Sequence, residues 1–468
     1  MIALTPSEIA VAIGGRLVHA RGGTDETPIA SQSQTDSREV APGEIFVARR
    51  GEETDGHLFV AQAVDRGAAL LVVEREIDDR VPQIVVDDAT LALGRLAKAV
   101  VRLALDAGKL RIVGITGSNG KTTTKNLVAA MAERLGPTVA SARSFNNEVG
   151  GPLTMLRVET DTETLVAEMG ASGEGEIARL TDMAPPHIGV VLSVGLAHAG
   201  EFGGIETTFR TKSEMVRDLP ETAVAVLNRD DPWVSRMAEL TQARIVWFGQ
   251  HSEAEVRASD IEGSAEGTTF TLHLGGESLP VRFRVLGEHH VANAMAAAAI
   301  GLELGLAPAQ IVETLEAATL AAPGRMQVLP GRDGITVIND AYNASPDSMS
   351  AALKTLAQIG KPGARTVAVL GAMSELGGLA GEEHDRIGLQ VVRLGISELV
   401  VVGKEARRLH ISAINEGSWD GESVFFEDHD EALRYLADTV QPGDTVLVKS
   451  SNAAGLQRLG DRLGEALV

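Results

Sequence analysis

The chain has 468 residues, too many for one hydrophobic core, which predicts two to four domains. Its 44% hydrophobic and 23% charged residues are typical of a soluble globular protein, and its net charge of −22 argues against general affinity for nucleic acid or anionic membranes. The absence of cysteine excludes disulfides, thiolate catalysis and thiolate metal sites. No signal-peptide pattern and no bilayer-spanning apolar run occurs, so we expect a cytoplasmic protein without membrane insertion.

The first part of the chain alternates short strands and helices. Thr5 predicts a helix N-cap, with proline in the first turn and Glu8 completing a capping box. Downstream, apolar runs predict strands at 46–48, 70–73 and 84–86 and a helix at 91–105. We interpret residues 1–108 as a first α/β domain.

Two further sets of strand–helix units follow. Continuous apolar runs, each followed by a helical pattern, favour parallel sheets covered on both faces. The runs lie at 111–116, 164–168, 188–192 and 223–227, and again at 335–338, 366–370, 398–402 and 445–448. Pro323-Gly324 punctuates the chain between the two sets. The expected fold class is therefore α/β, with three α/β domains in series at 1–108, 109–320 and 321–468.

A phosphate-binding loop is predicted where the strand at 111–116 runs into a helix. The intervening residues Gly117, Ser118, Asn119 and Gly120 let backbone N–H groups surround phosphate oxygens, and the helix N-terminus adds partial positive charge. In this pattern the lysine at 121 reaches the β- and γ-phosphates and the threonine at 122 binds Mg²⁺. The glycines fall at 114, 117 and 120, which is not the common Walker A spacing, and the alternative is a glycine-rich turn with a chance Gly-Lys-Thr.

Two polar residues that follow strand ends, and a lysine on a predicted helix, are considered for the same site. Glu168 ends a strand, and a carboxylate in that position points into the crevice where ligands bind in open α/β sheets. Its oxygens are suitable ligands for Mg²⁺. The alternative is a glutamate that caps a helix or faces solvent. His198 follows the strand at 188–192, and by itself reads as a structural histidine. Lys212 by itself reads as a solvated helix lysine.

Together these features resemble the Mur ligase superfamily, over almost the whole chain. The N-terminal part carries Thr35-Asp36-Ser37-Arg38, and the central part carries the phosphate loop, 144–150 and the Glu168–Ile177 block, which is typical of the D-alanyl-D-alanine-adding branch. The resemblance implies a uridine-binding first domain, a central P-loop-type ATPase domain with a parallel sheet, and a Rossmann-like C-terminal domain that binds the incoming dipeptide and closes over ATP.

The resemblance also implies roles for individual residues. The UDP-substrate would contact Ser37, Arg38, Asn146 and Asn147. ATP would contact Gly117, Ser118, Asn119, Gly120, Lys121, Thr122, Thr123, Asn293, Arg325 and Asp340. Two Mg²⁺ ions would be held by Thr122, Glu168, His198 and Lys212, with carbamylated Lys212 as a ligand; the catalytic set would be Lys121, Glu168, His198 and Lys212. Tyr342 and Asn343 would lie near the site, although Tyr342 reads equally well as a packing residue.

Three departures from the family pattern lie in the third domain. Ala372 stands where the family usually has Asp, Asn339 replaces a common Asp, and Ser450 and Asn452 replace the Gly and Arg of Lys-Gly-Ser-Arg. These changes bear on dipeptide binding and domain closure, whereas the ATP and metal chemistry does not depend on them.

The implied reaction is the ATP-dependent addition of D-alanyl-D-alanine to UDP-N-acetylmuramoyl-tripeptide by a monomeric enzyme, through an acyl phosphate, in peptidoglycan synthesis. Within the superfamily, the alternative is the ligase that adds the third residue, which usually carries Asp-Asn-Pro-Arg, a string absent here. A folylpolyglutamate synthase would lack the match around residues 37 and 38. From another class, a P-loop ATPase that couples hydrolysis to motion or partner binding would turn over ATP without an amine acceptor.

Overall fold

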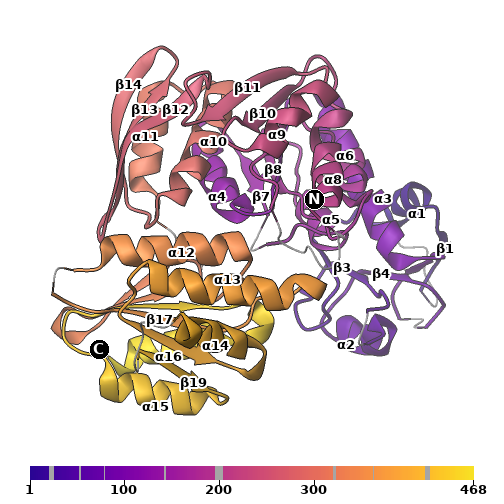
Figure 1. Ribbon diagram of the computed structural model, residues 1–468. Coiled ribbons are helices and arrows are strands. Elements are labelled where there is room, and N and C mark those ends of the chain that lie inside the picture. Colours follow the sequence, from indigo (N-terminus) through magenta and orange to yellow (C-terminus); the bar gives the residue numbers. More distant parts are fainter. Residues whose placement is uncertain are drawn as a thin grey trace.

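The computed structural model describes residues 1–20, 26–51, 54–77, 80–141, 144–195, 204–319, 323–361, 363–416 and 422–467. These residues form three β-sheets, each built from its own stretch of the chain and flanked by helices (Figure 1). No helix of this described part is both long and apolar enough to cross a membrane. The α/β fold class, with three sheets in which parallel pairs dominate, is as predicted.

The first sheet has five strands in the order β1-β5-β4-β3-β2, and all pairs except β1–β5 are parallel. Its elements are α1 (Pro6–Ile13), β1 (Arg16–Val18), β2 (Ser33–Gln34), β3 (Ile45–Val47), the 3₁₀ turn η1 (Gly56–Phe59), α2 (Val60–Asp65), β4 (Leu70–Val73), β5 (Gln83–Val85) and α3 (Ala89–Asp106). The predicted capping box is present, because Thr5 accepts a hydrogen bond from the Glu8 N–H and the Glu8 carboxylate accepts one from the Thr5 N–H.

The central sheet has nine strands in the order β14-β13-β12-β11-β10-β9-β6-β8-β7. Its strands are β6 (Arg111–Thr116), β7 (Thr138–Ala140), β8 (Thr164–Glu168), β9 (Ile188–Val191), β10 (Val224–Asn228), β11 (Arg244–Gly249), β12 (Val256–Ser264), β13 (Gly267–Leu274) and β14 (Glu277–Phe283). Its helices are α4 (Lys121–Ala132), α5 (Gly150–Met155), α6 (Glu176–Met183), α8 (Ile205–Arg217), α9 (Pro232–Arg236), the 3₁₀ turn η2 (Met237–Leu240), α10 (His289–Leu304) and α11 (Pro308–Ala317).

The central sheet differs from the expected all-parallel sheet at one edge. Strands β7 to β12 pair in parallel, but β12, β13 and β14 form an antiparallel meander. Its polar and apolar residues alternate, so one face is buried and the other is open to solvent, and the run carries no continuous apolar stretch. The prediction rested on such stretches and therefore missed these strands.

The third sheet has six strands in the order β15-β16-β20-β17-β18-β19, and only β15 is antiparallel to its neighbour. Its strands are β15 (Gln327–Pro330), β16 (Thr336–Asn339), β17 (Thr366–Leu370), β18 (Glu398–Val402), β19 (Ser423–Phe426) and β20 (Thr445–Lys449). Its helices are α12 (Pro346–Ile359), α13 (Ala380–Arg393), α14 (Arg407–Asn415), α15 (His429–Thr439) and α16 (Leu456–Ala466), with short 3₁₀ turns η3 (Arg332–Gly334), η4 (Gly377–Leu379), η5 (Lys404–Ala406) and η6 (Asn452–Ala454).

Helix α3 connects the first two sheets. Its buried residues belong to one hydrophobic cluster that continues from the first sheet into α5, α6 and α8 of the central part. Figure 1 shows α3 close to these helices. Gly94 in α3 lies so close to Met183 in α6 that an added Cβ would approach the Met183 methyl to 2.6 Å. The first and central parts therefore share a continuous core.

The third part contacts the central part through polar side chains and through Leu286, a residue of the central part that lies in the hydrophobic cluster of the third part. Ser345 donates a hydrogen bond to Asn119 (3.1 Å), Arg325 donates one to Ser144 (3.1 Å), and Gln358 donates one to Glu288 (3.0 Å). The first two of these bonds end on or beside the predicted phosphate loop. The third sheet is thus held with the start of α12 facing the loop.

Two of the departures from the family pattern have local explanations in the structure. Asn339 is fully buried, and its Nδ2 donates to the Gln457 carbonyl (2.9 Å) and to Asp461 (2.8 Å) in α16. An aspartate cannot donate either bond. The Ser450 side chain is also fully buried and donates to the Ser451 carbonyl (2.9 Å). Ala372 and the exposed Asn452 have no comparable side-chain role in the described residues.

We predict that Asn339→Asp lowers the free energy of unfolding by about 2–4 kcal/mol, because two buried donors are lost and a carboxylate is placed against Asp461. Thermal or urea unfolding measures the change. The double variant Asn339→Asp with Asp461→Asn restores one donor across the same contact and should recover part of the loss. Equal stability of wild type and Asn339→Asp would contradict this account.

Candidate active site

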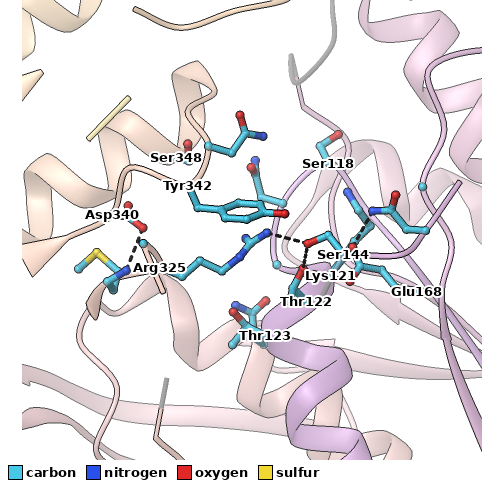
Figure 2. Close-up of a pocket in the computed structure, with 18 of the residues that line it drawn as sticks. Ser118, Lys121, Thr122, Thr123, Ser144, Glu168, Arg325, Asp340, Tyr342 and Ser348 are labelled. Atoms are coloured by element: carbon cyan, nitrogen blue, oxygen red, sulfur yellow. Dashed lines mark hydrogen bonds between the residues drawn. The ribbon is translucent and has the colours of Figure 1, made fainter. Parts of the chain in front are cut away.

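The phosphate loop has the predicted strand–loop–helix geometry. Strand β6 ends at Thr116 and helix α4 begins at Lys121, so the N-terminal N–H groups of α4 face the cavity drawn in Figure 2. Gly120 has a φ of +85°, and a Cβ there would lie 2.2 Å from Oδ1 of Asn293. Both the left-handed backbone and the close contact require glycine at this position. A chance Gly-Lys-Thr in an ordinary turn does not account for this arrangement.

The lysine of the loop is folded back onto its own turn. Lys121 donates from Nζ to the carbonyl of Gly117 at 2.6 Å. Burial lowers its pKa from the ordinary lysine value, while the carboxylate of Glu168 acts in the opposite direction. The ammonium thus lies beside the loop carbonyls, within reach of a phosphate in the cavity.

Glu168 is buried at the end of β8, with 2% of its surface exposed. One carboxylate oxygen accepts from Oγ1 of Thr122 (3.0 Å) and the other accepts from Nδ2 of Asn146 (2.8 Å). The alternative of a solvent-facing or helix-capping glutamate is therefore wrong. The carboxylate faces the cavity beside the first turn of α4 (Figure 2).

Lys212, in α8, is also buried, with 2% of its surface exposed, so the alternative of a solvated lysine is wrong. Burial lowers the pKa of its amine to about 7, and repulsion from Lys121 acts in the same direction, against Glu214 and Glu176. A substantial fraction of this amine is neutral near pH 7. His198, the other predicted member of the metal site, lies outside the described residues.

The third part of the chain supplies the opposite wall of the cavity. The guanidinium of Arg325 lies 4.1 Å from the ring centre of Tyr342 while it donates to Ser144 (Figure 2). Asp340 accepts from the N–H of Met326 (3.0 Å) and from Nζ of Lys449 (2.6 Å). Tyr342 is half-buried and holds Arg325 in place, so its packing role and its proximity to the site are both observed.

These walls enclose a cavity of about 360 Å³. The predicted residues that line it are Ser118, Asn119, Gly120, Lys121, Thr122, Thr123, Asn146, Asn147, Glu168, Asn293, Arg325 and Asp340. A second cavity of about 380 Å³ adjoins it, and Asn119, Gly120 and Asn293 line both. Gly117 and Lys212 are not among the lining residues of either cavity.

Sequence reasoning missed several residues that line the main cavity. Ser144 links Thr122 (3.3 Å) to Arg325, and Lys449 binds Asp340. His290 lies one turn before Asn293 in α10. Ser144 belongs to the segment 144–150 that carries the resemblance, but nothing in the spacing of Ser144 or His290 distinguishes them from their neighbours.

The four residues predicted for the UDP-substrate are divided between two cavities. Ser37 and Arg38 line a separate cavity of about 510 Å³ in the first part, whereas Asn146 and Asn147 line the main one. Arg38 forms a bidentate ion pair with Asp36, which holds the pKa of that carboxyl below its ordinary value. The Asn147 side chain accepts from the N–H groups of Val149 and Gly150 at the start of α5.

The side-chain oxygens near the loop are suitable ligands for Mg²⁺. Among the residues that the structure describes, no group of three or more His, Cys, Asp or Glu side chains gathers as a metal-binding cluster. Mg²⁺ is commonly held by one or two protein ligands together with substrate phosphates and water, and the buried oxygens of Thr122 and Glu168 fit that requirement.

Known protein families match segments in all three parts of the chain. Residues 115–301 match the Mur ligase middle domain, residues 324–452 match the Mur ligase, glutamate ligase domain, and residues 32–100 match the Mur ligase family, catalytic domain. The chain belongs to the Mur ligase family.

Full-length relatives of this Mur ligase are known. A UDP-N-acetylmuramoyl-tripeptide–D-alanyl-D-alanine ligase from Mycobacterium tuberculosis is 43% identical, over 99% of this chain and 98% of its own. MurF from Acinetobacter baumannii has a crystal structure with a TM-score of 0.88, 33% identity and 99% coverage of both chains. MurF from Thermotoga maritima, solved in complex with ADP, gives 0.81 at 27% identity, covering 94% of this chain and 98% of its own. A diaminopimelate ligase and a folylpolyglutamate synthase, at 20% and 17% identity, share the fold alone.

We predict that the Lys212 amine titrates near pH 7 in the folded protein, because burial and Lys121 both disfavour its charged form. Reductive ¹³C-methylation followed by NMR titration measures this, with the resonance assigned by its absence in Lys212→Ala. Lys98, which is half-exposed and paired with Asp182, provides a surface lysine for comparison in the same spectra. A Lys212 resonance that titrates near 10.5, the ordinary value of a lysine amine, would contradict the prediction.

Proposed function

We propose that this Mur ligase is a UDP-N-acetylmuramoyl-tripeptide–D-alanyl-D-alanine ligase, which uses ATP to add D-alanyl-D-alanine to the tripeptide precursor of peptidoglycan in the cytoplasm. The observation that carries the proposal is the single cavity in which the phosphate loop and Glu168 face Arg325 and Asp340 from the third sheet. The full-length similarity to ligases of that name supports the choice of substrates.

ATP would lie with its phosphates over the N-terminus of α4. Lys121 and Arg325 are cations that line the cavity, and both suit the β- and γ-phosphates. Asn293 lines both cavities and so is suited to contact the adenine end, while Asp340 lies on the opposite wall. The mycobacterial and Acinetobacter relatives extend over this whole region, and the Thermotoga relative was solved with ADP.

Mg²⁺ would be held by Thr122 and Glu168, with His198 and Lys212 completing a second site. Bound there, the metal would neutralise charge that develops on the phosphates. Lys212 would act as its carbamate, since CO₂ adds to a neutral amine and burial makes this amine neutral near pH 7. The carbamate would supply the anionic oxygen that a lysine lacks.

The reaction joins two anions before it forms the amide. The tripeptide carboxylate attacks the γ-phosphorus of ATP, and ADP leaves. The amine of D-alanyl-D-alanine then attacks the acyl carbon, and phosphate leaves through a tetrahedral intermediate. Lys121 and Arg325 lower the repulsion in the first step, because their positive charge is fixed beside the loop in a partly buried cavity.

Each of the three parts of the chain would bind a different substrate or part of a substrate. Residues 1–108 would bind the uridine end through Ser37 and Arg38, and residues 109–320 would bind ATP. Residues 321–468 would bind the dipeptide and close over ATP, as the hydrogen bonds of Ser345 and Arg325 across the cavity suggest. The protein would act as a monomer.

We predict phosphate release that depends on both UDP-N-acetylmuramoyl-tripeptide and D-alanyl-D-alanine, with a product heavier by one dipeptide. Lys121→Ala should abolish ADP formation, because it removes the cation beside the γ-phosphate, and should leave UDP-substrate binding intact. Coupled phosphate release and mass spectrometry measure the reaction, with Lys98→Ala as the control. Turnover with a single amino acid and the dipeptide precursor, or full activity of Lys121→Ala, would overturn the assignment.

We predict that Lys212→Ala loses activity and that a small carboxylic acid such as acetate or formate restores part of it, because the added carboxylate replaces the carbamate oxygens. Ligase activity is measured against carboxylic acid concentration. Lys98→Ala should show no response to the acid. Wild-type activity of Lys212→Ala without added acid would rule out the carbamate.

A further inference from the structure

His290, in the first turn of α10, carries a polar atom that has no hydrogen-bond partner in the described part of the chain. The residue is 8% exposed, and its Nε2 is buried without a hydrogen-bond partner among the described residues. Buried polar atoms in folded proteins are nearly always paired, and leaving one unpaired costs free energy. The ring lines the main cavity, so a ligand in that cavity can supply the partner.

The hydrogen bonds around His290 determine which of its nitrogens carries the proton. Oγ1 of Thr124 donates to Oδ1 of Asn293 (3.4 Å), and in this orientation of the amide its Nδ2 faces the ring. That Nδ2 lies 3.1 Å from Nδ1 of His290, and an amide nitrogen can only donate. Nδ1 is therefore the acceptor, and Nε2 of the neutral ring bears the hydrogen.

Burial keeps the ring neutral, and the charges around it act in the same direction. Burial holds the pKa of His290 well below its ordinary value, and His289, Lys449 and Arg325 act in the same direction. The ring therefore presents a neutral N–H donor among cationic side chains. An oxygen acceptor, and an anionic one in particular, suits this environment.

The position of the ring indicates which part of a nucleotide it meets. Asn293 lines both cavities, whereas His290 lines only the cavity that holds Lys121, Thr122 and Arg325. His290 is thus on the side of the phosphate loop. Its neighbour Asn293 lies against Gly120, the last residue before α4.

We propose that His290 is a nucleotide-binding residue whose Nε2–H donates a hydrogen bond to an oxygen of the ribose–phosphate part of ATP. This inference rests on the proposed function, because it places the nucleotide in the main cavity. It adds a contact to those that the phosphate loop, Arg325 and Asn293 provide. Helix α10 would then contact the ribose–phosphate part of the nucleotide through His290 and the adenine through Asn293.

The test compares two variants by isothermal titration with ADP in the presence of Mg²⁺. In His290→Gln the amide nitrogen occupies a position close to that of Nε2 and keeps the donor. His290→Phe keeps the ring and removes the donor. We expect His290→Phe to weaken ADP binding about tenfold, and His290→Gln to stay within about threefold of wild type. The melting temperature of each variant reports any loss of structure.

Titrations with AMP and adenosine locate the acceptor. A loss in His290→Phe for ADP and AMP but not for adenosine assigns it to a phosphate, and a loss for all three assigns it to the ribose. Equal ADP affinity of wild type and His290→Phe would overturn the inference while leaving the ATP site intact. An equal loss in both variants would also overturn it, since it would indicate a packing role alone. Failure of wild type to bind ADP would instead refute the proposed function.

Discussion

The buried carboxylate of Glu168 is the constraint on which the site depends. A carboxylate removed from water is costly unless hydrogen bonds and opposite charges compensate it. Here Thr122 in the first turn of α4 and Asn146 in the segment after β7 donate hydrogen bonds to the carboxylate. The positive charge of Lys121 lies close enough to interact with it. The start of α4 and the segment after β7 are therefore brought together at the end of β8.

The buried side chain of Lys125 supports the same arrangement. Lys125, one turn along α4 from Lys121, donates from Nζ to the carbonyl of Ser141 at 2.6 Å, and the Ser141 side chain accepts from the N–H of Glu168 at 3.3 Å. Burial lowers the pKa of Lys125, and the Glu168 charge opposes that shift. The end of β7 is thus fixed to α4, and with it the segment that carries Ser144 and Asn146 into the cavity.

The sequence predicted those parts of the molecule whose structure is decided locally. The bounds of β4, β6, β8, β17 and β18 agree with the predicted strands, because each is a continuous apolar run buried on both faces. The meander β12–β14 was missed because only one of its faces is buried. The phosphate loop was predicted because strand, glycines, lysine and helix are adjacent in the chain.

Contacts between distant segments could not be predicted in the same way. Nothing around Ser144 indicates that Arg325, 181 residues later, bonds to it, and nothing around Lys449 indicates its ion pair with Asp340. Asn146 and Asn147 were placed with the UDP-substrate by resemblance, but they line the main cavity and are far along the chain from Ser37. The roles given to individual residues remain predictions, and so does the metal site that includes His198.

The hydrophobic cluster that α3 shares between the first two sheets has a consequence for how the chain unfolds. The first part cannot separate from the central part without exposing the apolar side of α3. The third part is joined to the central part by hydrogen bonds between polar side chains and by Leu286, a residue of the central part that lies in the hydrophobic cluster of the third part. An interface that shares so little apolar surface opens at lower cost in water than a continuous core does. The molecule should therefore melt as two cooperative units, residues 1–319 in one calorimetric transition and residues 323–467 in another, with the boundary between them at the cavity itself.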